Sequence, residues 1–403
     1  MKTTTLKLCL PIIAMTAQQS GAALLIPPFL DELKYPVSAI GTLISLAPVF
    51  ALVARLPSGL IYKGDRARWL MVAALSIMSV CTVLYSIAVQ PLAFAFVHAL
   101  NGLAYGAATT IYLAFYVDAL PADEDRHHAM GYYAGCLAIG YSTGGFLAGY
   151  LADRWGYAVT FEIVALLGVL CIALLLFLKS PPIAMGSKAP SRGSGSTLRE
   201  SLLRFLDTRI ARIVVVALFL NLLHQMGSVF LPLYGIAIGL TLTEVGVIKG
   251  FYALCNAITR PLSGFVAKRV GHQKFSLGGL PLQSAFLMLV PFSHDFGPLL
   301  TVFLASGFLR AVAIVSNTIS MVEDVDETKV SRGVASGIFN AAGDIGNILG
   351  PSLGGLVASY TGVARLFLVG PFLTALFFLA AFWSCRFIPK LKAETMKAEI
   401  SDD

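Results

Sequence analysis

The sequence contains apolar stretches that are longer and more continuous than the core segments of a soluble domain. Val72–Val89 and Val164–Leu178, for example, carry no charged side chain. A helix needs about 20 mostly apolar residues to cross the hydrocarbon core of a bilayer, whereas a membrane-spanning strand alternates over about ten. Because backbone groups in lipid must be hydrogen-bonded internally, these stretches predict membrane-spanning helices.

The composition indicates a chain that lies mostly inside the membrane. Hydrophobic residues make up 57% of the 403 residues and charged residues only 13%, whereas soluble domains carry about 25% charged residues. So few charges cannot cover the surface of two or three soluble domains. The six cysteines are scattered and are typical of small apolar filler. We predict an all-α integral membrane protein.

Charge clusters and Pro/Gly turns divide the chain into twelve predicted spans. Lys2 and Lys7 precede the first, as in a signal peptide, but the apolar character continues to Leu30, which is too long for a cleaved signal. The predicted spans cover residues 7–30, 38–62, 69–90, 92–117, 129–152, 157–179, 209–236, 242–267, 275–293, 297–322, 332–359 and 363–387.

The basic residues predict the orientation in the membrane. Twelve spans place both termini on one side, and most of the 29 Lys and Arg residues fall on that side. Only Lys34, Arg154 and Arg365 fall in the opposite loops. The positive-inside rule therefore places both termini in the cytoplasm of a multi-pass protein of the inner or plasma membrane. The net charge of +7 is explained in this way without a nucleic-acid partner.

A stretch rich in Gly, Ser and Pro, Gly186–Thr197, separates two groups of six spans. A flexible linker followed by a basic interfacial helix accounts for this part of the chain. We predict an N-terminal six-helix half (1–179), a cytoplasmic linker (180–208), a C-terminal six-helix half (209–388) and a cytoplasmic tail (389–403).

The two halves repeat in sequence. A shift of 205 residues brings Arg55 onto Arg260, and a shift of 206 brings Gly140 onto Gly346. A duplicated six-helix unit is typical of secondary transporters that rock two halves about a midplane site. Further identities at the second shift are Arg126/Arg332, Ala129/Ala335, Gly131/Gly337, Gly144/Gly350, Gly149/Gly355, Gly156/Gly362 and Phe161/Phe367.

Between the predicted spans 8 and 9, the run Gly264-Phe-Val-Ala-Lys268-Arg269-Val-Gly271-His-Gln-Lys274 resembles the cytoplasmic-loop signature of the Major Facilitator Superfamily, G-x-x-x-D-R-x-G-R-R. The first-half copy, Gly59–Arg68, is degenerate, because Lys63 occupies the acidic position. Gly350-Pro351-Ser-Leu-Gly354-Gly355 is similar to the glycine-proline motif of the drug/metabolite:proton antiporter branch. That branch carries the motif in span 5, where this chain has Gly145 in place of the proline.

A third motif departs further from the antiporter branch. In span 4 that branch has an arginine tied to proton exchange, four residues before a glycine. Here His98 stands in its place before Asn101 and Gly102. Two alternatives stay open: a histidine can titrate near neutral pH and do related proton work, or His98 hydrogen-bonds across helices and the chain is not coupled in that way.

The resemblance implies a secondary active transporter that moves a small organic molecule by alternating access, with proton-coupled efflux as the first expectation. Proton-coupled uptake of a small organic anion, or a non-transporting sensor or scaffold on the same fold, are the alternatives. The resemblance also places spans 1, 4, 7 and 10 around a central cavity. The predicted substrate and proton pathway comprises Gln18, Gln19, His98, Asn101, Tyr105, Asn221, His224, Gln225, Arg310 and Asp344.

Arg310 and Asp344 are the most specific candidates, because charge inside a membrane span is costly. At a rise of 1.5 Å per residue both lie about 18–20 Å from opposite ends of their spans, so we expect them to pair near the midplane. The pair is either structural, or Arg310 anchors an anionic substrate, or Asp344 carries a proton. Four other charged residues are expected near span ends, where they can snorkel: Arg55, Glu162, Lys249 and Arg260.

Charged residues at the cytoplasmic ends of the spans suggest a gate. We expect acid–base clusters to latch the two halves when the cavity opens outward; the alternative is ordinary positive-inside charge with solvated acids. The candidate gate residues are Lys63, Arg66, Asp118, Lys268, Arg269, Glu323 and Asp324.

Several functional classes lack their motifs. The sequence has no P-loop, no H-E-x-x-H and no C-x-x-C. We therefore predict no enzymatic activity, no cofactor and no metal. The expected partners are a small-molecule substrate, protons and the lipid bilayer, and the expected state is a monomer.

Overall fold

A computed structural model describes residues 3–120, 126–178, 208–328 and 332–385. The predicted linker, apart from residue 208, and the predicted tail lie outside these residues. The first half contains α1 (Thr3–Glu32), α2 (Val37–Ile61), α3 (Gly64–Leu84), α4 (Pro91–Asp118) and α5 (Arg126–Leu176). The second half contains α7 (Thr208–Ala237), α8 (Leu242–Val270), α9 (His272–Leu287), the 3₁₀ turn η1 (Val290–Phe292), α10 (Phe296–Thr328), α11 (Arg332–Thr361) and α12 (Val363–Ser384).

The predicted twelve-helix membrane fold is confirmed. The described residues form eleven α-helices, and α5 is interrupted at Gly156, where φ is 75° and ψ is 177°. Dividing α5 there gives twelve helical segments. By length and composition, 9 described helices can cross a membrane, with α5 counted once. The remaining two helices, α8 and α11, carry charged residues that line the cavity described below.

The sequence repeat is visible in the backbone. Gly156 ends the first part of α5, and its repeat counterpart Gly362 separates α11 from α12. Both have positive φ, 75° and 82°, a region that glycine enters without the steric cost of a Cβ atom. The same turn therefore joins the last two spans of each half.

Glycines also set the closest helix approaches within each half. A Cβ atom added to Gly144 on α5 would clash with the Ala17 carbonyl oxygen on α1. One added to Gly346 on α11 would clash with the Leu218 carbonyl oxygen on α7. Small residues at such contacts let helices pack closely in lipid. These glycines therefore set the close approach of α1 to α5 and of α7 to α11.

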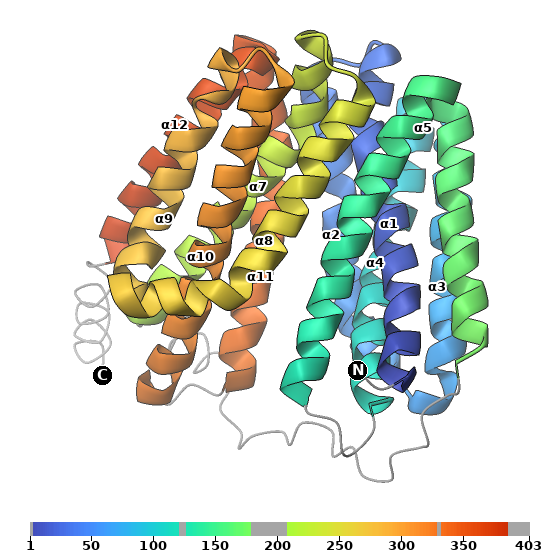
Figure 1. Ribbon diagram of the computed structural model, residues 1–403, viewed down its shortest axis with the longest axis horizontal. Coiled ribbons are helices and arrows are strands. Elements are labelled where there is room, and N and C mark those ends of the chain that lie inside the picture. The colour runs from blue at the N-terminus through green and yellow to red at the C-terminus, as the bar shows by residue number, and fades with distance from the viewer. Residues whose placement is uncertain (1–2, 121–125, 179–207, 329–331, 386–403) are drawn as a thin grey trace, which may run out of the picture.

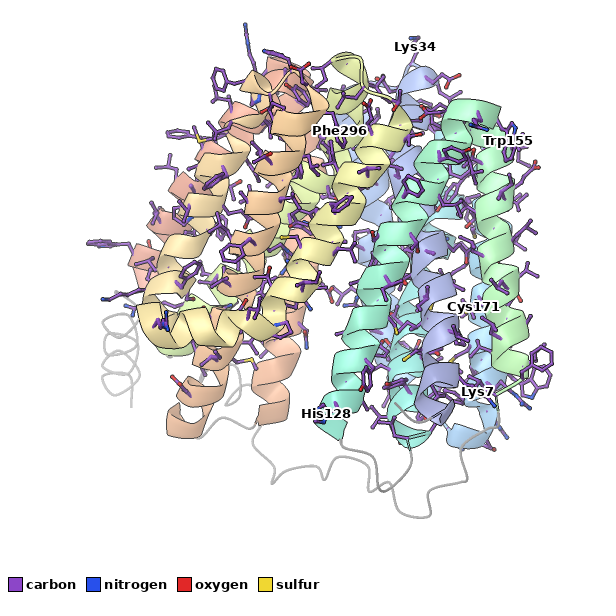
Figure 2. All side chains as sticks on the ribbon, viewed as in Figure 1. Lys7, Lys34, His128, Trp155, Cys171 and Phe296 are labelled. Atoms are coloured by element: carbon purple, nitrogen blue, oxygen red, sulfur yellow. The ribbon has the colours of Figure 1, made fainter. Side chains whose placement is uncertain are left out.

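The two halves lie side by side and diverge toward the end of the bundle at which α1 begins and α12 ends (Figure 1), here called the termini end. Lys7 and His128 lie at this end, whereas Lys34 and Trp155 lie at the opposite, far end (Figure 2). α2 packs against α11, and α5 against α8, to join the halves.

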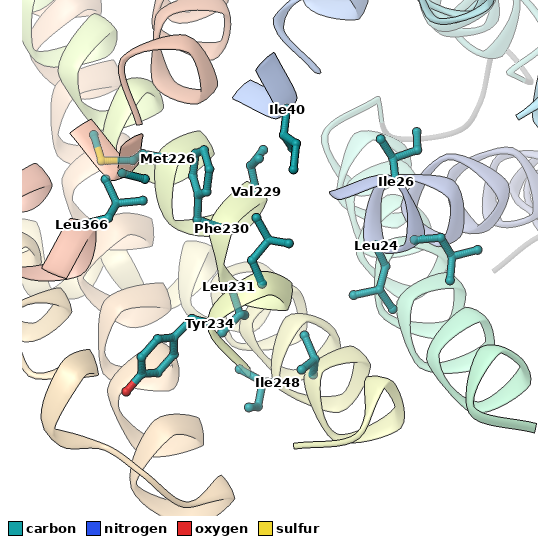
Figure 3. Close-up of a cluster of buried hydrophobic side chains, with 14 of the residues drawn as sticks. Leu24, Ile26, Ile40, Met226, Val229, Phe230, Leu231, Tyr234, Ile248 and Leu366 are labelled. Atoms are coloured by element: carbon teal, nitrogen blue, oxygen red, sulfur yellow. The ribbon is translucent and has the colours of Figure 1, made fainter. Parts of the chain in front are cut away.

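The buried core joins the halves only toward the far end. One cluster contains residues of both halves, such as Ile26 and Ile40 with Val229 and Phe230 (Figure 3). A second cluster, near the termini end, draws on the first half alone. Asp153 adds a polar contact at the far end, since its carboxylate accepts the backbone N–H groups of Leu242 at 3.0 Å and Thr243 at 2.7 Å.

Candidate functional site

A cavity of about 530 Å³ lies between the two halves. It is lined by α1, α2, α4 and α5 of the first half and by α7, α8, α9, α10 and α11 of the second. The core shared by the two halves lies on its far-end side. The volume is within the range of sites that bind small organic molecules, about 300–1,000 Å³.

The structure brings most of the predicted pathway residues to this cavity. They line it from α1, α4, α7, α10 and α11: Gln19, Tyr105, Asn221, His224, Gln225, Arg310 and Asp344. His98 and Asn101 instead line an adjoining pocket of about 120 Å³, which shares Gln19, Gln225 and Lys249 with the main cavity.

Gln18 lies away from both spaces. Its side chain is fully buried, and Nε2 donates to Thr82 Oγ1 on α3 at 3.1 Å. Gln18 therefore ties α1 to α3, and the neighbouring Gln19 is the glutamine that faces the cavity.

Arg310 is buried, with 8% of its surface exposed, and its partners are neutral. One terminal nitrogen donates to the Leu220 carbonyl oxygen at 2.6 Å, and the other donates to Asn221 Oδ1 at 2.9 Å. Both acceptors lie on α7. The guanidinium is thus fixed against α7 at the edge of the cavity.

The predicted pairing of Arg310 with Asp344 is wrong. Asp344 on α11 forms an ion pair with Arg55 on α2, in the other half. Depth along a helix does not give the face on which each residue lies. α11 packs mainly against α7 and α2, whereas α10 packs against α8 and α9, so Asp344 is directed toward α2.

Arg55, Lys249 and Arg260, which were expected near the span ends, all line the cavity. On α8, Lys249, Tyr252, Asn256 and Arg260 follow at helical spacing and form one polar stripe. Arg260 donates from Nε to Asn256 Oδ1 at 3.2 Å. The repeat carried a signal for two of these residues, since Arg55 and Arg260 occupy equivalent positions.

Two aromatic side chains that the sequence did not single out, Tyr252 and Tyr141, also line the cavity. Tyr252 stacks on His224 with ring centroids 5.3 Å apart and an interplanar angle of 10°. Its hydroxyl lies 3.0 Å from His224 Nδ1. Across the cavity, the Tyr105 and Tyr141 hydroxyls are hydrogen-bonded to each other. The cavity therefore offers aromatic faces as well as hydrogen-bonding groups.

The cavity lining is electropositive. It contains four basic residues, Arg55, Lys249, Arg260 and Arg310, against one acidic residue, Asp344, a net formal charge of +3 with histidine neutral. Among the described residues, the ion pair of Arg55 neutralises one of the four. The other three lie on α8 and α10 in the second half.

His98 is held by two hydrogen-bond partners. Nε2 lies 3.3 Å from the Ile44 carbonyl oxygen, and Nδ1 lies 2.8 Å from the Tyr85 hydroxyl. A carbonyl oxygen only accepts, so Nε2 carries the proton and Nδ1 accepts from Tyr85. This geometry corresponds to cross-helix hydrogen bonding, and a role in proton transfer stays a prediction.

The predicted gate residues lie near the termini end. Asp118 accepts a hydrogen bond from the Tyr62 hydroxyl at 2.6 Å. Lys63, Arg66, Arg269 and Glu323 are exposed, and the side chains of Lys268 and Asp324 lie outside the described part of the structure. Since the halves diverge at this end, the latch stays a prediction for the opposite conformation.

Comparisons with known proteins agree with this architecture. The sequence profile of the Major Facilitator Superfamily matches residues 8–325 and 237–399. The chain is 22% identical over 358 residues to the uncharacterized MFS-type transporter MJ1560 of Methanocaldococcus jannaschii, covering 89% of this chain and 88% of that protein. It is 26% identical over 346 residues to the multidrug resistance protein MdtG of Klebsiella pneumoniae, covering 82% and 79%.

Solved structures show the same fold. The nucleoside transporter NupG aligns with a TM-score of 0.77 at 17% identity, covering 96% of this chain and 100% of that one. A bacterial homologue of the human lysosomal transporter Spinster aligns with a TM-score of 0.76 at 15% identity, covering 96% and 97%. The relatives are transporters and not enzymes. With matches over nearly its whole length, this chain belongs to the Major Facilitator Superfamily.

Proposed function

We propose that the protein is a secondary active transporter that exports a small organic molecule across the inner or plasma membrane in exchange for protons. The observation that carries the proposal is the cavity of about 530 Å³ between two halves whose shared core lies toward the far end. A site between two rocking halves is what alternating access requires. With both termini in the cytoplasm, this conformation opens inward.

Two observations support export. The multidrug resistance protein MdtG is similar to this chain, and the similarity covers 82% of this chain. In addition, α11 carries the glycine-proline sequence that resembles the antiporter motif. Neither observation concerns the cavity itself. The direction of transport is therefore the first part of the proposal to test.

Asp344 is the proposed proton carrier. It is the only carboxylate among the described residues that line the cavity. Its partner Arg55 lies in the other half, so protonation of Asp344 would remove a charge pair that joins the halves. Proton binding and the relative position of the halves would then be linked.

The predicted cytoplasmic latch belongs to the same cycle. When the termini end closes, the first-half cluster of Lys63, Arg66 and Asp118 would approach the second-half cluster. The second-half cluster comprises Lys268, Arg269, Glu323 and Asp324. Charge pairs between the two clusters would form only in the outward-open state and would stabilise it. Neutralising Lys268 together with Arg269 should therefore increase the inward-open population.

The experiment uses purified protein in proteoliposomes that contain a pH-sensitive dye. Compounds that stabilise the protein against heat are first selected from a chemical panel, because a bound ligand raises the melting temperature. Each selected compound is then added with and without a pH gradient. Proton movement that depends on the compound is expected for wild type and is lost in Asp344→Asn.

The direction of transport is measured in cells that express the protein. Export predicts lower accumulation of the transported compound than in cells with an empty vector; higher accumulation would establish the alternative of uptake. Selected compounds that bind but never cross the membrane would favour the alternative of a sensor or scaffold.

Reporters inserted near Ser194 and fused after Asp403 should both lie in the cytoplasm, and opposite locations would contradict the proposed topology.

A further inference from the structure

Two arginines at equivalent positions of the repeat have different partners. Arg55 on α2 is paired with the Asp344 carboxylate. Arg260 on α8 donates from Nε to the neutral side-chain oxygen of Asn256 at 3.2 Å. Both arginines line the cavity. Of two equivalent arginines, one thus has a carboxylate partner, and the described partner of the other is an amide.

The two seams that join the halves repeat each other. On the seam between α2 and α11, Ser45 Oγ donates to the Ile348 carbonyl oxygen at 2.7 Å. The repeat counterparts of these residues, by the shifts of 205 and 206, are Gly250 on α8 and Ser142 on α5. A Cβ atom on Gly250 would lie 3.1 Å from the Ser142 carbonyl oxygen. Equivalent positions therefore face each other across both seams.

The same shifts identify what stands opposite Arg260. The repeat counterpart of Asp344 is Ala138 on α5, by the shift of 206 residues. Ala138 and Arg260 both line the cavity. Where the first seam has a carboxylate, the second has a methyl group. By the repeat, the position opposite Arg260 therefore lacks the carboxylate charge that Asp344 supplies to Arg55.

The neighbouring cations strengthen this asymmetry. The charges of Arg260 and Arg310 lie close enough to interact, and His224 lies within the influence of Lys249, Arg260 and Arg310. Of the described residues that line the cavity, the one carboxylate is Asp344, and it is paired with Arg55 across the seam instead of with these three cations. Cations inside a membrane span are costly unless an anion accompanies them.

We propose that the transported molecule is an organic carboxylate whose carboxylate group binds Arg260 at the position that Ala138 leaves open. The bound group takes the place that Asp344 has beside Arg55. A planar carboxylate matches the fork of an arginine side chain and accepts two parallel hydrogen bonds from it. Arg310 and Lys249 add positive charge, and the stacked His224 and Tyr252 face the uncharged part of the molecule. This inference rests on the proposed function, because it assigns a substrate class to the same cavity.

The first test is binding by matched pairs of compounds. Purified wild-type protein is heated with a panel of small aromatic and aliphatic carboxylic acids and with the primary amide of each. Acids are expected to raise the melting temperature, and their amides are not. The best acid should bind Arg260→Gln at least tenfold more weakly than wild type, with Arg260→Lys between the two. A panel in which no acid binds, or in which amides bind as well as acids, overturns the proposal.

The second test fills the open position from within the protein. Ala138→Asp supplies the carboxylate that the repeat lacks, so it should raise the melting temperature without ligand and weaken acid binding at least tenfold. Ala138→Asn, equal in bulk but neutral, measures the part of the effect that is due to size. The stabilisation should disappear when Ala138→Asp is combined with Arg260→Gln. Unchanged acid binding in Ala138→Asp, or stabilisation that persists without Arg260, contradicts the proposed location.

The two proposals fail in different ways. If proteoliposomes transport only neutral or cationic compounds, the function stands and the carboxylate class is wrong. If acids bind in the manner expected of Arg260 and Ala138 but no acid crosses the membrane, the binding site stands and the transport function is wrong.

Discussion

Arg55 on α2 and Asp344 on α11 form an ion pair that joins the two halves of the protein beside the central cavity. The same seam holds Ser45 against Ser352, with their hydroxyl oxygens 2.7 Å apart, and it brings Gly41 close to Gly355 at the far end. α2 and α11 run in opposite directions along the seam, so of these three contacts the ion pair lies nearest the termini end. The far-end contact between Gly41 and Gly355 therefore separates first when the halves part at the far end, and the ion pair separates last.

Removing one partner of this pair should destabilise the protein more than removing both. Asp344→Asn leaves Arg55 without a counter-charge, and Arg55→Gln leaves Asp344 without one. Side-chain exposures of 38% and 13% make the pair only partly buried, so we expect each single variant to cost about 1–2 kcal/mol. The double variant should lose less stability than either single variant, because neither charge is then left without its partner. Thermal unfolding of the four proteins in detergent forms the cycle that measures the coupling, and strictly additive losses would show that the pair contributes nothing.

Part of this arrangement was predictable from the sequence. Continuous apolar stretches define helices because lipid leaves the backbone no other hydrogen-bond partners. The repeat located the Gly156 and Gly362 turns, since a backbone conformation with positive φ selects glycine wherever it recurs. Most of the predicted pathway residues line the cavity for a similarly direct reason: polar groups in a membrane span avoid lipid.

The rest depends on the direction in which each side chain points, which sequence position along a span does not give. Consecutive residues of a helix point about 100° apart, so Gln19 faces the cavity while Gln18 binds Thr82. Arg310 and Asp344 both line the cavity but belong to helices with different neighbours. The partner of Asp344 lies 289 residues away in the sequence. Only the packing of α2 against α11 brings the two together.

A disulfide across the α2–α11 seam should lock the protein open at the termini end. In a background with the six native cysteines replaced, Ser45→Cys with Ser352→Cys places two thiols where the hydroxyls are now in contact. Oxidation should crosslink them within one chain and stop transport, and a reductant should restore it. The single variants are the controls. Transport that continues in fully crosslinked protein would mean that the seam does not open during the cycle.

The close approach of α1 and α5 makes Gly144 intolerant of a methyl group. Gly144→Ala would push its Cβ atom against the Ala17 backbone, so we expect destabilisation of about 1–3 kcal/mol and less folded protein after extraction. Gly131 is the matched control on the same helix, because a Cβ atom there meets nothing within 4 Å. Gly131→Ala should be neutral or slightly stabilising. Equal melting temperatures for the two variants would contradict a packing role for Gly144.

Asp153 offers a way to shift the two halves without touching the cavity. Its carboxylate, at the far end of α5, accepts the Leu242 and Thr243 backbone N–H groups at the start of α8, so it caps a helix of the other half. Capping carboxylates are worth about 0.5–2 kcal/mol, and this one acts only while the far end is closed. Asp153→Ala should therefore raise the population that is open at the far end, by about twofold to thirtyfold for that range of free energy.

Glu244→Ala is the matched control, since Glu244 accepts from the Thr241 backbone N–H at 2.9 Å within its own half. Distances between spin labels at the far ends of α5 and α8 measure the shift. If both variants give the wild-type distance distribution, the inter-half cap does not hold this end closed; if both shift it alike, the effect comes from the start of α8 and not from the contact between the halves.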